Sequence, residues 1–399
     1  MQQPPYYHIC GIDTGTFHVA AILPTDAFEA RERWTTEGQI IRVENTATDY
    51  ASLIQALPTG TPIFLEPTGY YCTALVHYLR SKGFPLHFVL GKSTKDARER
   101  WFNLNNKRDD IDARALAAIG FHWLTYGAYP VAAATANSLD LALSQLTRQN
   151  AQSIKETTRA INRIRQIMLA TWPEAEPYTT QLLGAPSGSS RSPRPNLLER
   201  YTPAEIAQLS DAELAPNFRR IADRDRIREL AATTIGDPSP HLHTTLKRNA
   251  TQYGYWIRLA NTLQSEISEL VHKHPHYELL NTLPQLGDIT AAILCSAIRD
   301  IRLYPTKQAL RVQLGCYPEQ KQSGSSIDQT RAGKKGNRLA KQAIHLYALR
   351  LVAIKEGQFY RTLQRRQAQK QNHNLANLKQ QIVDVIWSML THGTPYESR

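Results

Sequence analysis

The sequence lacks the features that mark membrane and secreted proteins. Its 399 residues contain no apolar run of about 18 residues, the length that spans a bilayer, so no transmembrane helix is expected. The segment MQQPPYYHIC has no basic stretch followed by an apolar core, so we expect no signal peptide. The chain has only four cysteines, without a CxxC pair or nearby histidine pairs: Cys10, Cys72, Cys295 and Cys316. Disulfide and zinc frameworks are therefore disfavoured, and a protein of the reducing cytoplasm is predicted.

Acidic residues are scarce in one part of the chain. The formal net charge is +12, and the isoelectric point is about 9.5. Residues 1–130 hold 12 Lys and Arg against 13 Asp and Glu, whereas residues 299–372 hold 16 against 4. This imbalance favours nucleic acid as the partner over a merely solvated face. The candidate contacts are Lys334, Lys335, Arg338 and Lys341.

Alternating strand and helix patterns predict an α/β domain over residues 1–130. Strands are expected near 6–12, 19–23, 40–43, 62–65 and 86–90. Helical patterns occupy 51–57, 73–82 and 112–124. The first two strands are close enough to form an antiparallel hairpin, and the later alternation predicts a mostly parallel sheet.

A helical hairpin with a coiled-coil seam is predicted over residues 131–275. Apolar residues recur at steps of three, four or their multiples, which predicts a long helix with a seam at Leu139, Leu143, Leu146, Ile154, Ile161, Ile164 and Met168. A second long helix around 256–270 is expected to return beside it. Between them, the Pro/Ser/Gly composition of 185–195 predicts a flexible linker.

A helical third domain is predicted over residues 276–399. Residues 279–292 indicate a helix, a tight turn with Gly287, and a second helix. Such a turn can hold a phosphate through its backbone N–H groups, although an ordinary helical corner has the same pattern. A polar loop at 322–326 precedes helices expected at 338–352 and 378–390.

Four acidic residues occupy positions where an α/β domain is expected to hold a metal. Asp13 and Glu66 follow strands whose carboxyl ends should open into a crevice. Asp109 and Asp112 begin a helix and share one face, whereas Asp110 and Asp112 point apart. Oxygen ligands suit Mg²⁺ or Mn²⁺, and two such ions can clamp the attacking and leaving oxygens of a phosphodiester. Singly, each acid is also explained as a turn, strand-end or helix N-terminal residue; only the set favours a metal site.

Several segments resemble one family of transposases. ICGID at 9–13, FLEPTGY at 64–70 and KRDDIDARAL at 107–116 resemble the DEDD catalytic domain of the insertion sequence 110 family. TLPQLGDITA at 282–291 resembles that family's helix-hairpin-helix. Its serine-bearing block is similar to LGCYP at 314–318, QSG at 322–324 and KGNRL at 335–339. The resemblance covers nearly the whole chain and is weakest across 170–250.

The resemblance implies an RNase H-like first domain, similar to Holliday-junction resolvases, and a helical C-terminal transposase domain. It implies an RNA-guided recombinase that cleaves and rejoins DNA, with Mg²⁺ or Mn²⁺ held by the four acids. By position, Ser323 matches the nucleophile that becomes covalently joined to DNA.

The implied partners are donor DNA, target DNA and a structured noncoding bridge RNA that pairs with both. The implied assembly is a tetramer of two dimers in the prokaryotic nucleoid, with the serine of one subunit beside the acidic site of another.

The sequence leaves alternatives open. Ser325 and Ser326 are rival nucleophiles, and QSGSS is also an ordinary loop composition. The alternative function is a Mg²⁺-dependent, structure-specific DNA nuclease in which water attacks and no covalent intermediate forms. A non-catalytic RNA-binding or architectural protein is a third possibility. The chain also departs from the family where Gln285 and Arg299 replace frequent glycines.

Overall fold

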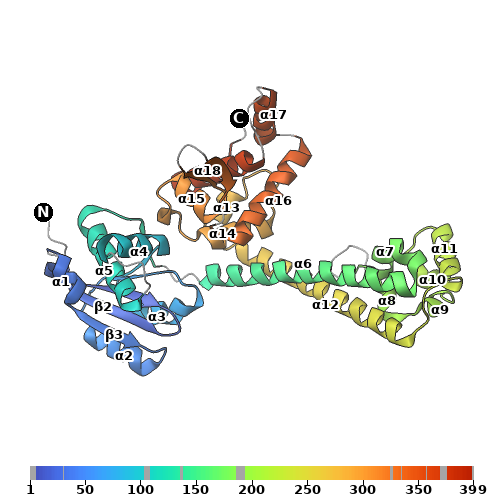
Figure 1. The fold of residues 1–399 in the computed structure, drawn as a ribbon, viewed down its shortest axis with the longest axis horizontal. Coiled ribbons are helices and arrows are strands. Elements are labelled where there is room, and N and C mark those ends of the chain that lie inside the picture. The colour runs from blue at the N-terminus through green and yellow to red at the C-terminus, as the bar shows by residue number, and fades with distance from the viewer. Residues whose placement is uncertain are drawn as a thin grey trace. The chain divides into compact units, whose positions relative to one another are not determined.

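The computed structural model separates into two compact units (Figure 1). The first comprises Met1–Leu141, Glu278–Leu286 and Leu294–Arg399, and the second comprises Ala142–Tyr277 and Gly287–Ile293. The structure describes residues 6–29, 31–102, 108–134, 138–185, 194–323, 327–333, 335–355, 357–368 and 375–397. Within these ranges, no helix is long and apolar enough to cross a membrane. The division into three domains stays a prediction.

A six-stranded sheet forms the N-terminal part of the first unit. In the order β3-β2-β1-β4-β5-β6, its strands are β3 (Gln39–Val43), β2 (His18–Pro24), β1 (His8–Thr14), β4 (Ile63–Leu65), β5 (Leu86–Val89) and β6 (Val131–Ala133). Strand β4 is parallel to β1 and β5, and the other three pairings are antiparallel. The prediction of a mostly parallel sheet is therefore wrong. Residues 15–17 are too few for a crossover, so β1 and β2 form the antiparallel hairpin that was predicted. The error concerns β3 and β6, which pair antiparallel with β2 and β5.

Helices cover both faces of this sheet (Figure 1). Along β1, Cys10 and Ile12 pack with α2 (Ala47–Ala56) and α3 (Tyr70–Ser81). Ile9 points the other way and packs with α5 (Asp109–Tyr126), because successive side chains of a strand alternate. The strands and helices predicted here are confirmed. The remaining elements are η1 (Thr25–Glu29), α1 (Arg31–Thr36), α4 (Gly91–Ala97) and the π-helix η2 (Arg98–Phe102).

Two long helices form the stem of the second unit, α6 (Ser138–Thr171) and α12 (Pro240–Val271). Residues near the end of α6 share a core with residues near the start of α12, so the helices run antiparallel as predicted. Ile154 was expected in the seam but is 47% exposed, whereas Thr147, Asn150 and Ser153 are buried. Small polar residues therefore face inward along this part of α6, whereas Leu143, Ile164 and Met168 of the predicted seam are buried as expected.

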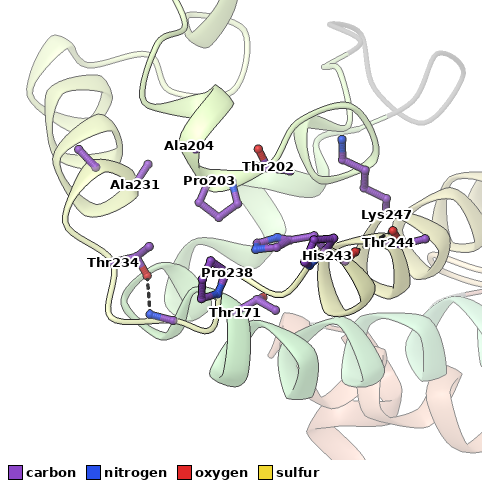
Figure 2. A pocket seen from close by; sticks show the side chains of 13 residues that line it. Thr171, Thr202, Pro203, Ala204, Ala231, Thr234, Pro238, His243, Thr244 and Lys247 are labelled. Atoms are coloured by element: carbon purple, nitrogen blue, oxygen red, sulfur yellow. Dashed lines mark hydrogen bonds between the residues drawn. The ribbon is translucent and has the colours of Figure 1, made fainter.

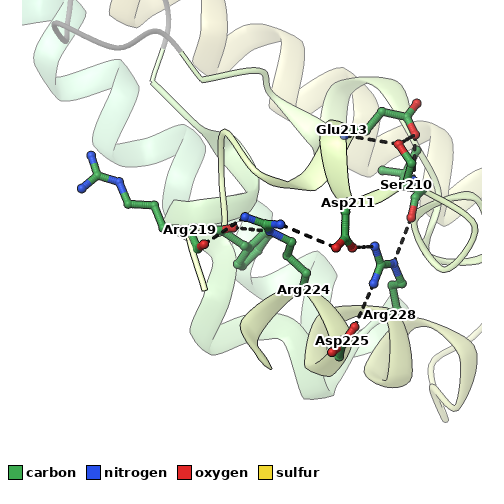
Figure 3. Close-up of polar contacts among 9 residues, drawn as sticks. Ser210, Asp211, Glu213, Arg219, Arg224, Asp225 and Arg228 are labelled. Carbon is green, nitrogen blue, oxygen red and sulfur yellow. Dashed lines mark hydrogen bonds and ion pairs between the residues drawn. The ribbon is translucent and has the colours of Figure 1, made fainter. Parts of the chain in front are cut away.

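Short helices pack around Trp172, at the end of the stem where α6 ends and α12 begins. They are η3 (Pro173–Tyr178), α7 (Thr179–Leu183), α8 (Leu197–Arg200), α9 (Pro203–Ile206), α10 (Asp211–Leu214) and α11 (Ile221–Ala232). The buried Trp172 indole donates a hydrogen bond to Leu230 O at 3.0 Å. Figure 3 shows that Asp211 faces Arg224 and Arg228, which joins α10 to α11. Most of the predicted linker, residues 186–193, lies outside the described residues.

The C-terminal part of the chain is mostly helical. Its helices are α13 (Tyr277–Leu280), α14 (Asp288–Ile298), η4 (Ile301–Leu303), α15 (Lys307–Gln313), α16 (Arg338–Ile354), α17 (Gly357–Ala368) and α18 (Leu375–His392). A hairpin of β7 (Pro318–Ser323) and β8 (Ile327–Ala332) interrupts them, so the prediction of a polar loop at 322–326 is wrong for residues 322 and 323. Pairing with β8 here outweighs the low strand propensity of the β7 residues, PEQKQS.

Candidate active site

Asp13, near the carboxyl end of β1, and Glu66, directly after the neighbouring parallel strand β4, lie at the same edge of the sheet. Ile12 of β1 is opposite Leu65 of β4, and each acid is the residue that directly follows one member of this pair. Asp13 lies on the same face as Ile9, since side chains two apart share a face. Both acids are half-buried. The hydroxyls of Thr14 and Thr68 share a hydrogen bond that ties the two strand ends together.

Helix α5 begins at this edge because it runs antiparallel to β1. Near its start, Ala113 packs with Val19, which is the partner of Asp13 across the sheet. Gly11 permits the close approach. A Cβ at Gly11 would lie 2.0 Å from Ala113 O and 2.4 Å from Ala117 N, so a larger residue does not fit. The first turn of α5 therefore lies at the strand ends that hold Asp13 and Glu66.

Asp112, in the first turn of α5, forms a buried ion pair. Arg98 Nη1 lies 2.6 Å from Asp112 Oδ1 and 2.9 Å from Oδ2. The two side chains are only 11% and 6% exposed. Asp112 is thus fixed at the edge of the sheet by an arginine rather than by solvent.

The other two acids of this helix start have different surroundings. Asp109 is the first residue of α5 and is half-buried. Asp110 is paired with Arg108, whose Nη2 lies 2.9 Å from Asp110 Oδ2 on the surface. Asp109 and Asp110 are both half-buried, so burial does not distinguish them, and the choice of metal ligands stays a prediction.

The chemistry of this edge suits a hard divalent ion. Its side-chain donors are carboxylate oxygens. Gly91, at the start of α4, leaves room for one of them, because a Cβ there would lie 2.9 Å from Glu66 Oε2. In the described part of the chain, no three Asp, Glu, His or Cys side chains already form a metal-binding group. Both oxygens of Asp112 contact Arg98 instead.

The cysteines do not add to this set. All four are buried, and burial raises the pKa of each thiol, that of Cys316 to about 11. A protonated thiol is a poor nucleophile and a poor metal ligand at neutral pH.

Ser323 is the last residue of β7, where the β7–β8 hairpin turns. Its Cα is opposite that of Ile327. Only its backbone is described, and the rival serines Ser325 and Ser326 lie outside the described residues. The structure therefore places the backbone of the candidate nucleophile at a hairpin tip, in a different part of the first unit from the four acids.

Comparisons with known proteins match two regions of the chain. Residues 10–173 match a DEDD transposase family model, and residues 277–364 match the model described as "Transposase IS116/IS110/IS902 family". The chain belongs to the IS110 family of transposases. A relative from Streptomyces coelicolor, "Insertion element IS110 uncharacterized 43.6 kDa protein", is 27% identical over 257 residues. That match spans 61% of this chain and 61% of the relative.

The candidate nucleic-acid contacts of this IS110-family protein surround the start of α16. Lys335 and Arg338 are exposed. Lys341 is half-buried and donates a hydrogen bond to Gly333 O at 2.9 Å, and Lys334 lies outside the described residues. Cations in the first turn of a helix oppose its dipole, so helix stability does not account for Arg338. Part of the basic stretch is structural, because Arg311 of α15 pairs with Asp384 of α18.

The segment predicted as a helix-hairpin-helix consists of α13, a turn and α14. Gln285 adopts a left-handed backbone with φ of 59°, a conformation that favours glycine. Asp288, the first residue of α14, accepts hydrogen bonds from Ser268 and from Tyr277 Oη. Burial opposes ionisation of Asp288, but these hydrogen bonds and His272 outweigh it and lower its pKa. The start of α14, at the turn that the sequence suggested as a phosphate site, thus already carries the Asp288 carboxylate, which neighbouring residues bind.

A cavity of about 520 Å³ lies at the start of α12 (Figure 2). Pro203, Pro238, His243 and Lys247 are among its lining residues. Burial lowers the pKa of His243. All of its lining residues belong to the second unit, whereas the four acids belong to the first. The cavity is therefore no part of the acidic edge.

Sequence reasoning missed Arg98 and Gly91. Arg98 is 14 residues before Asp112, in a stretch without a recognisable motif. Gly91 begins a helix that was not predicted. Neither residue left a signal in the sequence, because the burial of Asp112, which makes its charge require a partner, is seen only in the structure.

Proposed function

We propose that this chain is the transposase of an insertion element and that it cleaves and rejoins DNA. The observation that supports this most strongly is the shared edge of Asp13 and Glu66, which α5 completes with Asp109 and Asp112. We further propose that this part has an RNase H-like fold similar to junction resolvases. The antiparallel strands β3, β2 and β1, followed by β4 and β5 parallel to β1 and by the antiparallel β6, with helices on both faces, support that proposal.

Asp13, Glu66, Asp109 and Asp112 are the proposed ligands of Mg²⁺ or Mn²⁺, which supplies charge stabilisation at the scissile phosphate when bound. The half-burial of Asp13, Glu66 and Asp109 leaves them partly open to a substrate.

Ser323 is the proposed nucleophile. Its Oγ attacks the phosphorus, and a serine–phosphate bond forms as one phosphorus–oxygen bond of the DNA breaks. The serine hydroxyl gives up its proton, and the leaving deoxyribose oxygen takes up one. A hydroxyl of another strand can reverse this step, which rejoins DNA and frees the serine. The position of Ser323 at a hairpin tip supports such access.

Nucleic acid is the proposed partner of the basic surface. Donor DNA and target DNA are the proposed substrates, and a structured bridge RNA that pairs with both is the proposed guide. The net charge of +12 over residues 299–372 supports contact with several phosphates. The proposed assembly is a tetramer of two dimers in the prokaryotic nucleoid, in which Ser323 of one subunit acts beside the acids of another.

A suicide DNA substrate tests the nucleophile. We expect a protein–DNA complex that survives denaturing detergent, with the nucleotide located on Ser323 by peptide mass spectrometry. Ser323→Ala should abolish the complex and retain binding, because one hydroxyl contributes little to a charged interface. Ser325→Ala and Ser326→Ala are the matched controls and should retain it.

Other outcomes discriminate the alternatives. An adduct on Ser325 or Ser326 would keep the mechanism and change the residue. Efficient cleavage by Ser323→Ala without any adduct would instead support the metal-dependent nuclease. Mixing Ser323→Ala with Asp13→Asn subunits should restore part of the activity if sites are shared between subunits.

A further inference from the structure

The ion pair between Arg98 and Asp112 has a feature that a purely structural pair does not need. Arg98 contacts both carboxylate oxygens through the single nitrogen Nη1. Its Nε is buried and has no hydrogen-bond partner within the described residues. A buried donor without an acceptor costs free energy, so this is not the best environment the guanidinium could have.

The element that presents Arg98 also contacts a second acid of the site. Helix α4 begins at Gly91, against the Glu66 carboxylate, and ends at Ala97, directly before Arg98. Arg98 is the first residue of the π-helix η2, a conformation that is rare and frequent at functional sites. One short segment therefore touches Glu66 at its start and Asp112 at its end.

A carboxylate oxygen that contacts a guanidinium at 2.6 Å cannot at the same time bind a divalent ion at its normal distance without bringing two cations together. Like charges this close repel strongly in a buried site. Asp112 can therefore serve Arg98 or a metal ion, but it binds neither fully when both are present.

From this geometry we propose that Arg98 is a positioning residue that competes with the divalent ion for Asp112. In the metal-free protein it neutralises Asp112 and keeps the carboxylate at the edge of the sheet. Metal binding requires Arg98 to release Asp112, and the unpartnered Nε lowers the cost of that release. The competition makes the acidic site a weak metal site in the absence of DNA. This inference rests on the acidic edge of the proposed function.

The affinity of the DNA-free protein for a divalent ion tests the proposal. Calorimetric titration with Mn²⁺ should show tighter binding by Arg98→Gln than by the original protein, by between about fivefold and about 150-fold, the usual range of coupling between two ligands. Arg100→Gln is the matched control, because it removes an equal charge from an exposed position two residues away and should leave the affinity unchanged. Circular dichroism establishes that each variant is folded.

A merely structural role predicts the opposite result. Equal or weaker Mn²⁺ binding by folded Arg98→Gln would overturn the proposal. If Arg98→Gln does not fold, a crystal of the full chain grown with Mn²⁺ gives the answer: the proposal requires Arg98 to have left Asp112, and an unchanged pair beside a bound ion would refute it. Loss of Mn²⁺ binding in Asp13→Asn separates this question from the proposed function, which fails if that variant binds Mn²⁺ normally.

Discussion

Replacing Gly11 by alanine perturbs the contact that seats α5 on β1. The new Cβ would lie 2.0 Å from Ala113 O and 2.4 Å from Ala117 N. Heavy atoms do not approach much closer than about 3 Å, so α5 must move by at least about 1 Å. Both obstructing atoms are backbone atoms, and no side-chain rotation relieves the clash.

The expected cost has two parts. Overpacking of a tight core destabilises by about 1–3 kcal/mol, and a backbone clash places Gly11→Ala at the upper end. The displacement also moves Asp109 and Asp112 away from Asp13, and a misplacement of about 1 Å can lower a reaction rate by about 100-fold. Strand cleavage should therefore fall by that order even where the variant is fully folded.

Urea unfolding and single-turnover DNA cleavage measure the two parts. Gly254→Ala in α12 is the matched control, since its Cβ would meet only the ends of two side chains, Arg258 Nη1 at 3.2 Å and Glu199 Oε2 at 3.7 Å, and no backbone atom outside the helix. That change should stabilise by about 0.5–1 kcal/mol, because alanine favours a helix over glycine. Unchanged stability and cleavage in Gly11→Ala would refute the placement of α5.

Three further predictions concern other parts of the chain. Gln285→Gly should raise the free energy of unfolding by about 1 kcal/mol in a urea titration, because it relieves a left-handed backbone at φ of 59°; an unchanged midpoint would contradict this. Charge reversal at Lys335 and Arg338 should lower the salt dependence of DNA binding by about one unit of slope per lost phosphate contact. An unchanged salt dependence would show that Lys335 and Arg338 form a solvated helix face and do not contact DNA. The stability deficit of Asp288→Asn should be full above pH about 4 and shrink in stronger acid, since a lowered pKa stabilises only while the carboxylate is charged. A deficit independent of pH would exclude that ionic contribution.

The strands of the sheet were predictable because they are short apolar runs bounded by turns. Their directions were only partly predictable. The short connection between β1 and β2 allows only the antiparallel pair that was predicted, whereas no apolar run shows that β3 and β6 also pair antiparallel with their neighbours. The β7–β8 hairpin was missed because residues such as Lys321 and Gln322 lack strand propensity, and pairing across the hairpin decides their conformation.

The candidate site shows the same limit. Asp13 and Glu66 could be placed at one edge from their strands alone. The partner of Asp112 could not, because Arg98 reaches it through packing of α4 and η2 on α5, which leaves no periodic pattern in the sequence. The position of Ile154 in the α6 seam was wrong for a related reason, since Asn150 and Ser153 are small enough to be buried there instead.

The central claim, that the acidic edge cleaves DNA, is tested most directly by comparing cleavage rates of Asp109→Asn and Asp110→Asn. The substitutions are chemically identical and adjacent, and Asp110 is already paired with Arg108 on the surface. Asp112→Asn is less decisive, because it leaves Arg98 buried without its partner and should destabilise by about 3–5 kcal/mol. We expect Asp109→Asn to abolish strand cleavage and Asp110→Asn to retain it, with both variants folded. Cleavage that survives Asp109→Asn and is lost in Asp110→Asn would contradict the account.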